Sequence, residues 1–327
     1  MKLTTEQILN VTVGAVHTEI TPDGIRFDKC TKRQIEAWYK MGEPYGKNAE
    51  ASTGVRLDFY TDSKSLAFDL VSGNRIDVYF DGVLRHHVNV YELHKEGKAP
   101  AFVIDKPLGE VGGETRVTVY FSSHNAIAVL KYLELDDGAT VKRPDYAKKL
   151  LFCGDSITQG WDSQWDSLSF ANSISRFFDA ESVVQGVGGA VFREDTFDPD
   201  LPFDPDAVVI AYGTNDYYVY KSYEEIRAHC RAYLTKVKEH YADHGKPVFV
   251  LMPLWRDDRF YDGAVGDFAT VRRIQAEEAK SLGLISIDTI NFIPPLAEFF
   301  SDKVLHPNAV GFGIYTQNII KEMLKHL

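Results

Sequence analysis

Residues 150–160 read Leu-Leu-Phe-Cys-Gly-Asp-Ser-Ile-Thr-Gln-Gly, a short apolar run that turns abruptly polar. An apolar run of this length predicts a strand that is buried on both faces, as in a parallel sheet. The Gly-Asp-Ser that follows would then lie at the carboxyl end of the strand, which is where open α/β sheets bind their ligands. This stretch therefore predicts a fold for the region and a place to search for chemistry.

Further apolar runs of the same kind follow, with helical patterns between them. They cover residues 182–184, 207–210, 248–251 and 284–287. One helix is expected from Ser222, because Glu225 three residues later completes a capping-box pattern. A second is expected from about Asp267 to Gly283. Alternating strands and helices predict a parallel sheet that is covered on both sides.

The preceding part of the chain has a different period. From Gly54 to about Leu135, apolar and polar residues alternate, which is typical of half-buried strands. Asp81-Gly82, at the end of one such strand, predicts a hairpin turn. Several short strands without a long amphipathic helix between them predict an antiparallel sandwich or jelly roll. The clearest alternating sets are Val55, Leu57 and Phe59; Leu66, Phe68 and Leu70; and Ile76, Val78 and Phe80.

The change of period divides the chain within residues 140–148, a polar and basic stretch that contains a proline. We expect an all-β sandwich or jelly-roll domain over residues 1–145 and an α/β domain over residues 146–327. Both lengths are ordinary for a domain.

Composition excludes several classes of protein. Hydrophobic residues make up 44% of the 327 residues and charged residues 25%, which is ordinary for a globular protein and excludes extended disorder. The 36 basic and 47 acidic residues give a net charge of -11, which would repel nucleic-acid phosphates and anionic lipids. We therefore expect neither a nucleic-acid nor a membrane partner.

Localisation and metal content follow from what the sequence lacks. No apolar run approaches the ~18 residues that a membrane span needs, and the first residues lack the apolar stretch of a secretory signal, so we expect a cytoplasmic protein. Cys30, Cys153 and Cys230 are too widely spaced for a zinc site or a redox pair, and the histidines outside residues 301–308 lack ligand spacing. We expect buried reduced thiols, no metal and no cofactor.

Four polar segments lie near the expected strand ends or the C-terminus. Each alone is also typical of a turn or a helix start, and Pro307 would suit the first turn of a helix. Together they supply a serine, an imidazole to take its proton and a carboxylate to orient that imidazole, in the form of Ser156, His306 and Asp302. The segments are Gly154-Asp155-Ser156, Gln185-Gly186-Val187-Gly188-Gly189, Gly213-Thr214-Asn215-Asp216 and residues 301–308.

These segments resemble, in order, the four sequence blocks of the SGNH (GDSL-type) hydrolase superfamily, over roughly residues 149–327. The resemblance implies a flavodoxin-like α/β/α sandwich with five parallel strands. It also implies that Ser156 is the nucleophile and His306 the general base. The oxyanion hole would be formed by the N–H groups of Ser156 and Gly189 and by the amide of Asn215. A β domain ahead of such a domain is similar to the two-domain carbohydrate esterases.

One position departs from the family pattern. The family aspartate usually lies three residues before the histidine, where this sequence has Lys303, whereas Asp302 lies four residues before it. An ammonium group cannot accept the imidazole N–H. Either a longer loop brings Asp302 to His306, or the site uses a Ser–His pair with another acceptor. We predict that Asp302 completes the triad.

Trp255 and Arg256 follow the fourth predicted strand, and we expect them to bind substrate. An indole can stack on a sugar ring while polar groups bind its hydroxyls. The alternative is that such rings only pack loops onto the sheet.

The combined prediction is a serine esterase that removes small acyl groups such as acetyl from a carbohydrate or glycoside through an acyl-enzyme on Ser156. Its substrate would be a small-molecule or oligosaccharide ester. One alternative is a lysophospholipase or thioesterase of the same superfamily. Another is an inactive carbohydrate-binding protein. The sequence leaves open a homo-oligomer.

Overall fold

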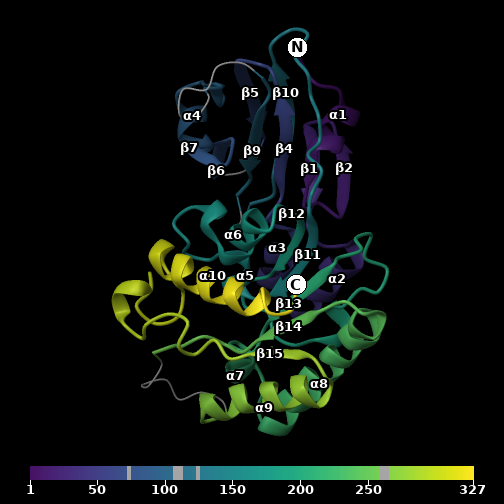
Figure 1. Ribbon diagram of the computed structural model, residues 1–327, viewed down its shortest axis with the longest axis vertical. Helices are drawn as coiled ribbons and strands as arrows, with labels where there is room; N and C mark the ends of the chain where they lie inside the picture. Colours follow the sequence, from purple (N-terminus) through teal and green to yellow (C-terminus); the bar gives the residue numbers. More distant parts are fainter. Residues whose placement is uncertain (72–74, 106–112, 123–125, 258–264) are drawn as a thin grey trace.

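The structure is a computed structural model, and it describes residues 1–71, 75–105, 113–122, 126–257 and 265–327. It has two lobes: an upper one built of antiparallel strands and a lower one built around a parallel sheet (Figure 1). The chain starts at the far tip of the upper lobe and ends in the lower lobe. None of the helices in the described ranges is both long and apolar enough to cross a membrane.

The lower lobe contains five parallel strands in the order β12-β11-β13-β14-β15, which confirms the predicted flavodoxin-like sheet. In the register of this sheet, Gly154 lies beside Gly186 on one side and Ala211 on the other. Three of the polar segments therefore leave the sheet at the same level. The strands are β11 (Lys148–Gly154), β12 (Ala180–Gly186), β13 (Ala207–Ala211), β14 (Val248–Leu251) and β15 (Ile285–Ile287).

Helices cover both faces of this sheet. On one face, α6 (Phe170–Phe177) and α10 (Ala309–Met323) pack on it, and on the other α8 (Tyr223–His240) and α9 (Phe268–Ser281). Helix α8 begins after the predicted side-chain cap at Ser222, and α9 begins at the predicted position, after Asp267, which also caps its helix. Asn308 caps α10, so Pro307 lies ahead of the helix and not in its first turn. The shorter helices of the lobe are α5 (Ser156–Gln159) and α7 (Asp216–Val219), with 3-10 turns η2 (Asp166–Leu168), η3 (Glu194–Thr196), η4 (Ala242–His244) and η5 (Ala297–Phe299).

The upper lobe is a sandwich of two sheets, β1-β4-β9-β6-β7 and β2-β3-β10-β5-β8, as the alternating pattern predicted. Leu57 and Val78 of one sheet share a buried cluster with Phe68 and Leu133 of the other. Asp81-Gly82 forms the expected hairpin turn, with positive φ at both residues. The elements are α1 (Thr5–Val11), β1 (Thr12–Val13), β2 (His17–Thr21), β3 (Gly24–Asp28), β4 (Arg56–Thr61), β5 (Ser65–Leu70), β6 (Arg75–Phe80), β7 (Val83–Asn89), α4 (Val90–Lys95), β8 (Ala101–Val103), β9 (Thr115–Tyr120) and β10 (Val129–Leu135).

Two helices of the N-terminal half pack on the parallel sheet. Helices α2 (Lys32–Met41) and α3 (Glu43–Glu50) place Trp38 and Ala49 in one buried cluster with Leu151 of the sheet. The connection from β12 to β13 contains only the short turn η3, so it supplies no helix to cover this face. Helices α2 and α3 take that position, which sequence analysis did not predict.

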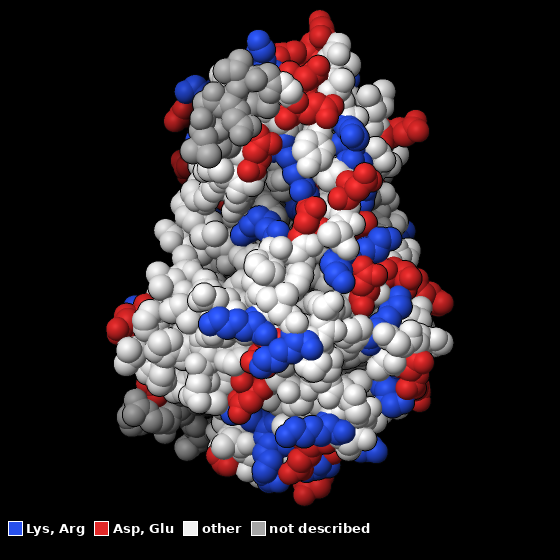
Figure 2. Space-filling model, viewed as in Figure 1, with Lys and Arg blue, Asp and Glu red and all other residues white. Residues whose placement is uncertain are grey.

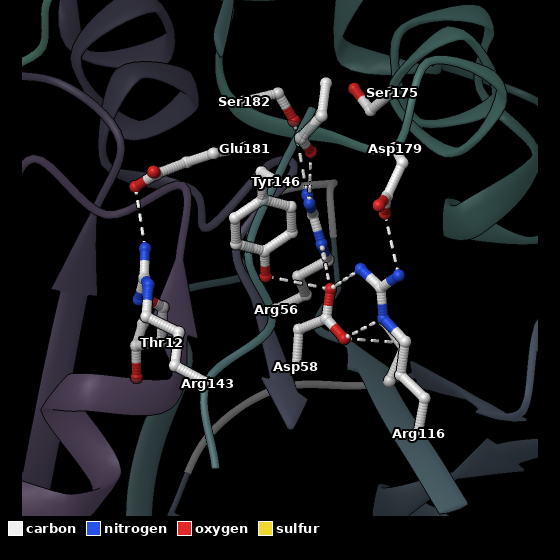
Figure 3. Close-up of polar contacts among 12 residues, drawn as sticks. Thr12, Arg56, Asp58, Arg116, Arg143, Tyr146, Ser175, Asp179, Glu181 and Ser182 are labelled. Carbon is white, nitrogen blue, oxygen red and sulfur yellow. Dashed lines mark hydrogen bonds and ion pairs between the residues drawn. The ribbon is translucent and has the colours of Figure 1, made fainter. Parts of the chain in front are cut away.

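A network of charges joins the two lobes at the amino ends of the parallel strands (Figure 3). Arg116 forms two 2.9 Å hydrogen bonds to Asp58 and one of 2.7 Å to Asp179. Arg56 donates to the carbonyl oxygen of Ala180 at 2.7 Å, and Tyr146 donates its hydroxyl to Asp58. Burial would raise the pKa of Asp58, but the Arg116 hydrogen bonds and the charge of Arg56 lower it overall.

Beside this network, a cleft of about 620 Å³ lies between the two lobes. It reaches Ala180, the first residue of β12, and so lies at the opposite end of that strand from Gly186. On the face drawn in Figure 2, acidic and basic side chains are interspersed over both lobes. The acidic side chains therefore do not form a single acidic patch on this face.

We predict that Asp58→Asn destabilises the protein by about 3 kcal/mol, because it leaves two guanidinium groups without their buried carboxylate. Chemical denaturation followed by circular dichroism measures the change. The matched control is Glu96→Gln, which removes a carboxylate from a fully exposed pair and should leave the midpoint unchanged. Equal midpoints for Asp58→Asn and the unmodified protein would contradict this role of the network.

Candidate active site

Ser156, His306 and Asp302 lie together beyond the carboxyl end of β11. Ser156 opens helix α5, and its Oγ lies 2.9 Å from Nε2 of His306. Nδ1 of the same imidazole lies 2.7 Å from a carboxylate oxygen of Asp302. The three side chains are therefore linked in the order of a catalytic triad: a nucleophile, a base and a group that orients the base.

The loop before His306 accommodates the residue that departs from the family pattern. Lys303 has a φ of 66°, so the extra residue is taken up in a left-handed turn. One carboxylate oxygen of Asp302 accepts the N–H groups of Val304, Leu305 and His306, while the other faces the imidazole. Partial burial would raise the pKa of Asp302, but the hydrogen bonds from His306 and these N–H groups hold it well below its usual range.

The other predicted oxyanion donors, Gly189 and Asn215, lie in the loops that follow the neighbouring strands β12 and β13. Gly189 has a φ of 80°, and Asn215 donates from Nδ2 to the carbonyl of the next residue, Ala190, at 3.0 Å. No residue in the described part of the chain accepts the N–H of Ser156 or of Gly189. N–H groups without an acceptor in the protein are suited to receive an oxyanion.

Two buried carboxyl groups fix the loops that carry these donors. Asp155 accepts the N–H of Ile157 at 2.9 Å and so caps helix α5, while Asp216 accepts the N–H of Phe192 at 3.1 Å. Burial raises the pKa of Asp155 to about 6 and that of Asp216 to about 7. Asp216 thus connects the loop after β13 to the loop after β12.

Trp255 and Arg256, the predicted substrate residues, are placed differently from each other. The Trp255 ring is half-buried and packs on Phe300, with 4.9 Å between ring centroids. Arg256 is buried, donates to the carbonyl of Thr214 at 2.8 Å, and lies over the ring of Tyr218. Its guanidinium therefore supports the backbone next to Asn215, and its contact with substrate stays a prediction.

Sequence reasoning missed two residues of helix α3 that reach the site. Asn48 donates from Nδ2 to the carbonyl of Gly188 at 3.2 Å, and the ring of Tyr45 lies against Gly189. Asn48 and Gly188 are 140 positions apart. No local pattern in the sequence signals such a contact.

Three groups of the kind that bind metal ions also meet at the site. One oxygen each of Asp162 and Asp302 and one ring nitrogen of His306 lie within 4.8 Å of one another. The Asp302 carboxylate and the imidazole already satisfy each other through their hydrogen bond. The expectation that the protein needs no metal stays a prediction.

Sequence comparison matches part of this chain to one family. The profile of the GDSL-like Lipase/Acylhydrolase family matches residues 152–314. This range contains the four segments singled out above. No curated protein sequence matches the chain.

Solved structures similar to this one include enzymes that share both lobes. The salicylyl-acyltransferase SsfX3 from a tetracycline biosynthetic pathway has a TM-score of 0.78 at 18% identity, covering 96% of this chain and 94% of its own. A family two carbohydrate esterase from Clostridium thermocellum, in complex with cellohexaose, has a TM-score of 0.64 at 14% identity, with coverage of 97% and 100%. One from Cellvibrio japonicus has a TM-score of 0.63 at 15% identity, with coverage of 96% and 94%. Identities this low show a common fold.

We predict that Asp216→Asn changes how stability depends on pH. At about pH 8 the Asp216 carboxyl is ionised in both states, and burial of the charge disfavours folding. At about pH 5 the folded protein keeps the proton that an unfolded aspartate releases, so the unmodified protein gains about 2–3 kcal/mol relative to Asp216→Asn. Urea denaturation of both proteins at the two pH values measures this difference. A constant difference between them would contradict the raised pKa.

Proposed function

We propose, from the premise that residues 152–314 form a domain of the GDSL-like lipase/acylhydrolase family, that this protein is a serine esterase acting on small acyl esters of carbohydrates. The observation that carries the proposal is the hydrogen-bonded chain from Ser156 through His306 to Asp302. Family membership supports acyl ester hydrolysis in general. The nucleophile, the acetyl group and the sugar are our proposals.

In the first half-reaction, Ser156 Oγ attacks the ester carbonyl carbon while Nε2 of His306 takes its proton. Asp302 holds the imidazole and stabilises the imidazolium that forms. The carbonyl oxygen becomes an oxyanion that accepts hydrogen bonds from the N–H groups of Ser156 and Gly189 and from the Asn215 amide. His306 then gives its proton to the leaving alcohol, and the acyl group remains on Ser156.

In the second half-reaction, water replaces the alcohol. His306 takes a proton from water as the water oxygen adds to the acyl carbonyl carbon, and the same donors stabilise the second oxyanion. When the bond to Ser156 breaks, the proton returns from His306 to the serine oxygen. The products are the free acid and the original enzyme.

Two observations support a sugar ester. The carbohydrate esterases that share this two-lobed fold include one with a bound oligosaccharide, cellohexaose. Within this chain, the centroids of the Trp161 and His306 rings are 6.4 Å apart. The indole is thus placed to stack on the alcohol side of a substrate. A comparison of acetyl with decanoyl esters separates this reading from a lysophospholipase or thioesterase, which would prefer the longer chain.

A second candidate is transfer of the acyl group to an acceptor alcohol. It is favoured by the likeness to a salicylyl-acyltransferase over both lobes. The acyl-enzyme would be the same, and only the group that attacks it would differ. Adding a sugar alcohol to the ester assay distinguishes the two, since a transferase forms the new ester faster than the free acid.

We predict that Ser156→Ala abolishes hydrolysis of p-nitrophenyl acetate while leaving the circular dichroism spectrum unchanged, because it removes the hydroxyl that attacks the ester and carries the acyl group. Ser281→Ala, at the end of helix α9, is the matched control and should keep full activity. A fluorophosphonate probe should label the unmodified protein and not Ser156→Ala. Failure to label the unmodified protein would favour the inactive carbohydrate-binding protein.

We predict that Asn215→Ala lowers kcat by ~10²–10³, or ~2.7–4 kcal/mol, because one oxyanion donor is lost. KM should change little, since this donor acts on charge that develops only in the transition state. Steady-state kinetics on p-nitrophenyl acetate measures both constants. An Asn215→Ala enzyme with full kcat removes Asn215 from the oxyanion hole.

A further inference from the structure

The backbone of Gly188 is held on both sides by side-chain amides. Asn48 of helix α3 donates from Nδ2 to its carbonyl at 3.2 Å, and Gln159 of helix α5 accepts its N–H at 2.8 Å. Gln159 belongs to the segment that carries Ser156, whereas Asn48 comes from the N-terminal half of the chain. All three residues are buried.

The bond from Asn48 fixes the direction of a different group. The carbonyl of Gly188 and the N–H of Gly189 belong to one peptide unit, and in a trans peptide they point in opposite directions. None of the peptide bonds in the described ranges is cis. Holding the carbonyl toward α3 therefore turns the Gly189 N–H away from α3. The reverse peptide orientation would place that N–H toward the Asn48 amide.

Close packing leaves this peptide little room to rotate. A Cβ on Gly188 would lie 2.7 Å from Nδ2 of Asn48 and 3.0 Å from Oε1 of Gln159. A Cβ on Gly189 would lie 3.0 Å from the ring of Tyr45. All three distances are shorter than ordinary contacts, so side chains of helices α3 and α5 pack closely against the glycine loop.

Helix α3 is itself anchored at the turn that carries Asn48. The buried ammonium group of Lys29 donates to the backbone carbonyls of Asn48 at 2.6 Å and Ala51 at 2.7 Å, and to the hydroxyl of Thr53 at 3.0 Å. These bonds satisfy carbonyls that a helix end leaves without partners. The backbone from which the Asn48 side chain projects is thereby held in place.

We propose that Asn48 is a positioning residue of the esterase, which sets the Gly188–Gly189 peptide so that the Gly189 N–H points at the substrate oxyanion. The proposal rests on the function proposed above and adds to it a role for the N-terminal half. Asn48 acts through the peptide and does not touch the substrate.

Two variants of Asn48 test this role. Asn48→Leu removes the donor at similar size, and Asn48→Asp replaces it with an acceptor that repels the Gly188 carbonyl. Each should lower kcat roughly 10- to 100-fold, as loss of a supporting hydrogen bond does at other sites, with KM within about twofold. Asn318→Leu is the matched control. Asn318 lies on helix α10 and also donates a side-chain amide N–H to a backbone carbonyl, that of Phe292. Its kcat should stay unchanged.

Thermal melting of all three variants separates catalysis from stability, and kinetics are compared at a temperature where each is folded. A fall in kcat for the Asn48 variants but not for Asn318→Leu supports the proposal. Full kcat in either folded Asn48 variant overturns it. If Ser156→Ala is also fully active, the proposed function itself fails. If Ser156→Ala is inactive while Asn48→Leu is fully active, only the role of Asn48 fails.

Discussion

The face of the parallel sheet beside β12 needs an apolar cover that its own connections do not supply. The link from β12 to β13 has no full helix, so α2 and α3 bury Trp38 and Ala49 there. Burial of apolar surface is the main driving force of folding. Here the sheet comes from the C-terminal half of the chain and this part of its cover from the N-terminal half. The lower lobe is therefore completed by residues that precede most of the upper lobe in sequence.

The geometry of the candidate site depends on the parallel sheet and on the helices that cover it. The register of the sheet brings the ends of β11, β12 and β13 to one level, which places three polar loops side by side. Buried groups then tie the loops together: Asp216 holds the loop after β12, Arg256 holds Thr214, and Asn48 holds Gly188. All three groups bond to the backbone of the loops that carry the predicted donors, so they constrain where those donors point.

The sequence predicted the features that depend on local patterns. The five buried strands were found because short apolar runs signal strands that are buried on both faces, and α8 was found from its cap at Ser222. Asp302 reaches His306 because the backbone makes a left-handed turn at Lys303. From the sequence alone, another acceptor for the imidazole was also open. Helices α2 and α3 were missed because the face that they cover lies far away in the sequence. The burial of Arg256 against Tyr218 was missed for the same reason.

Ser156 is proposed to attack the acyl carbon while the Gly189 N–H, oriented by Asn48 of the N-terminal half, donates to the oxyanion that forms. A crystal structure of the protein after reaction with a small fluorophosphonate tests this proposal most directly, since the bound phosphonyl group resembles the tetrahedral intermediate. We expect the phosphorus on Ser156 Oγ, one phosphonyl oxygen within hydrogen-bond distance of the Gly189 N–H, and the Gly188 carbonyl still on Asn48. A phosphonyl group on another residue, or an oxygen turned away from Gly189, would contradict the account.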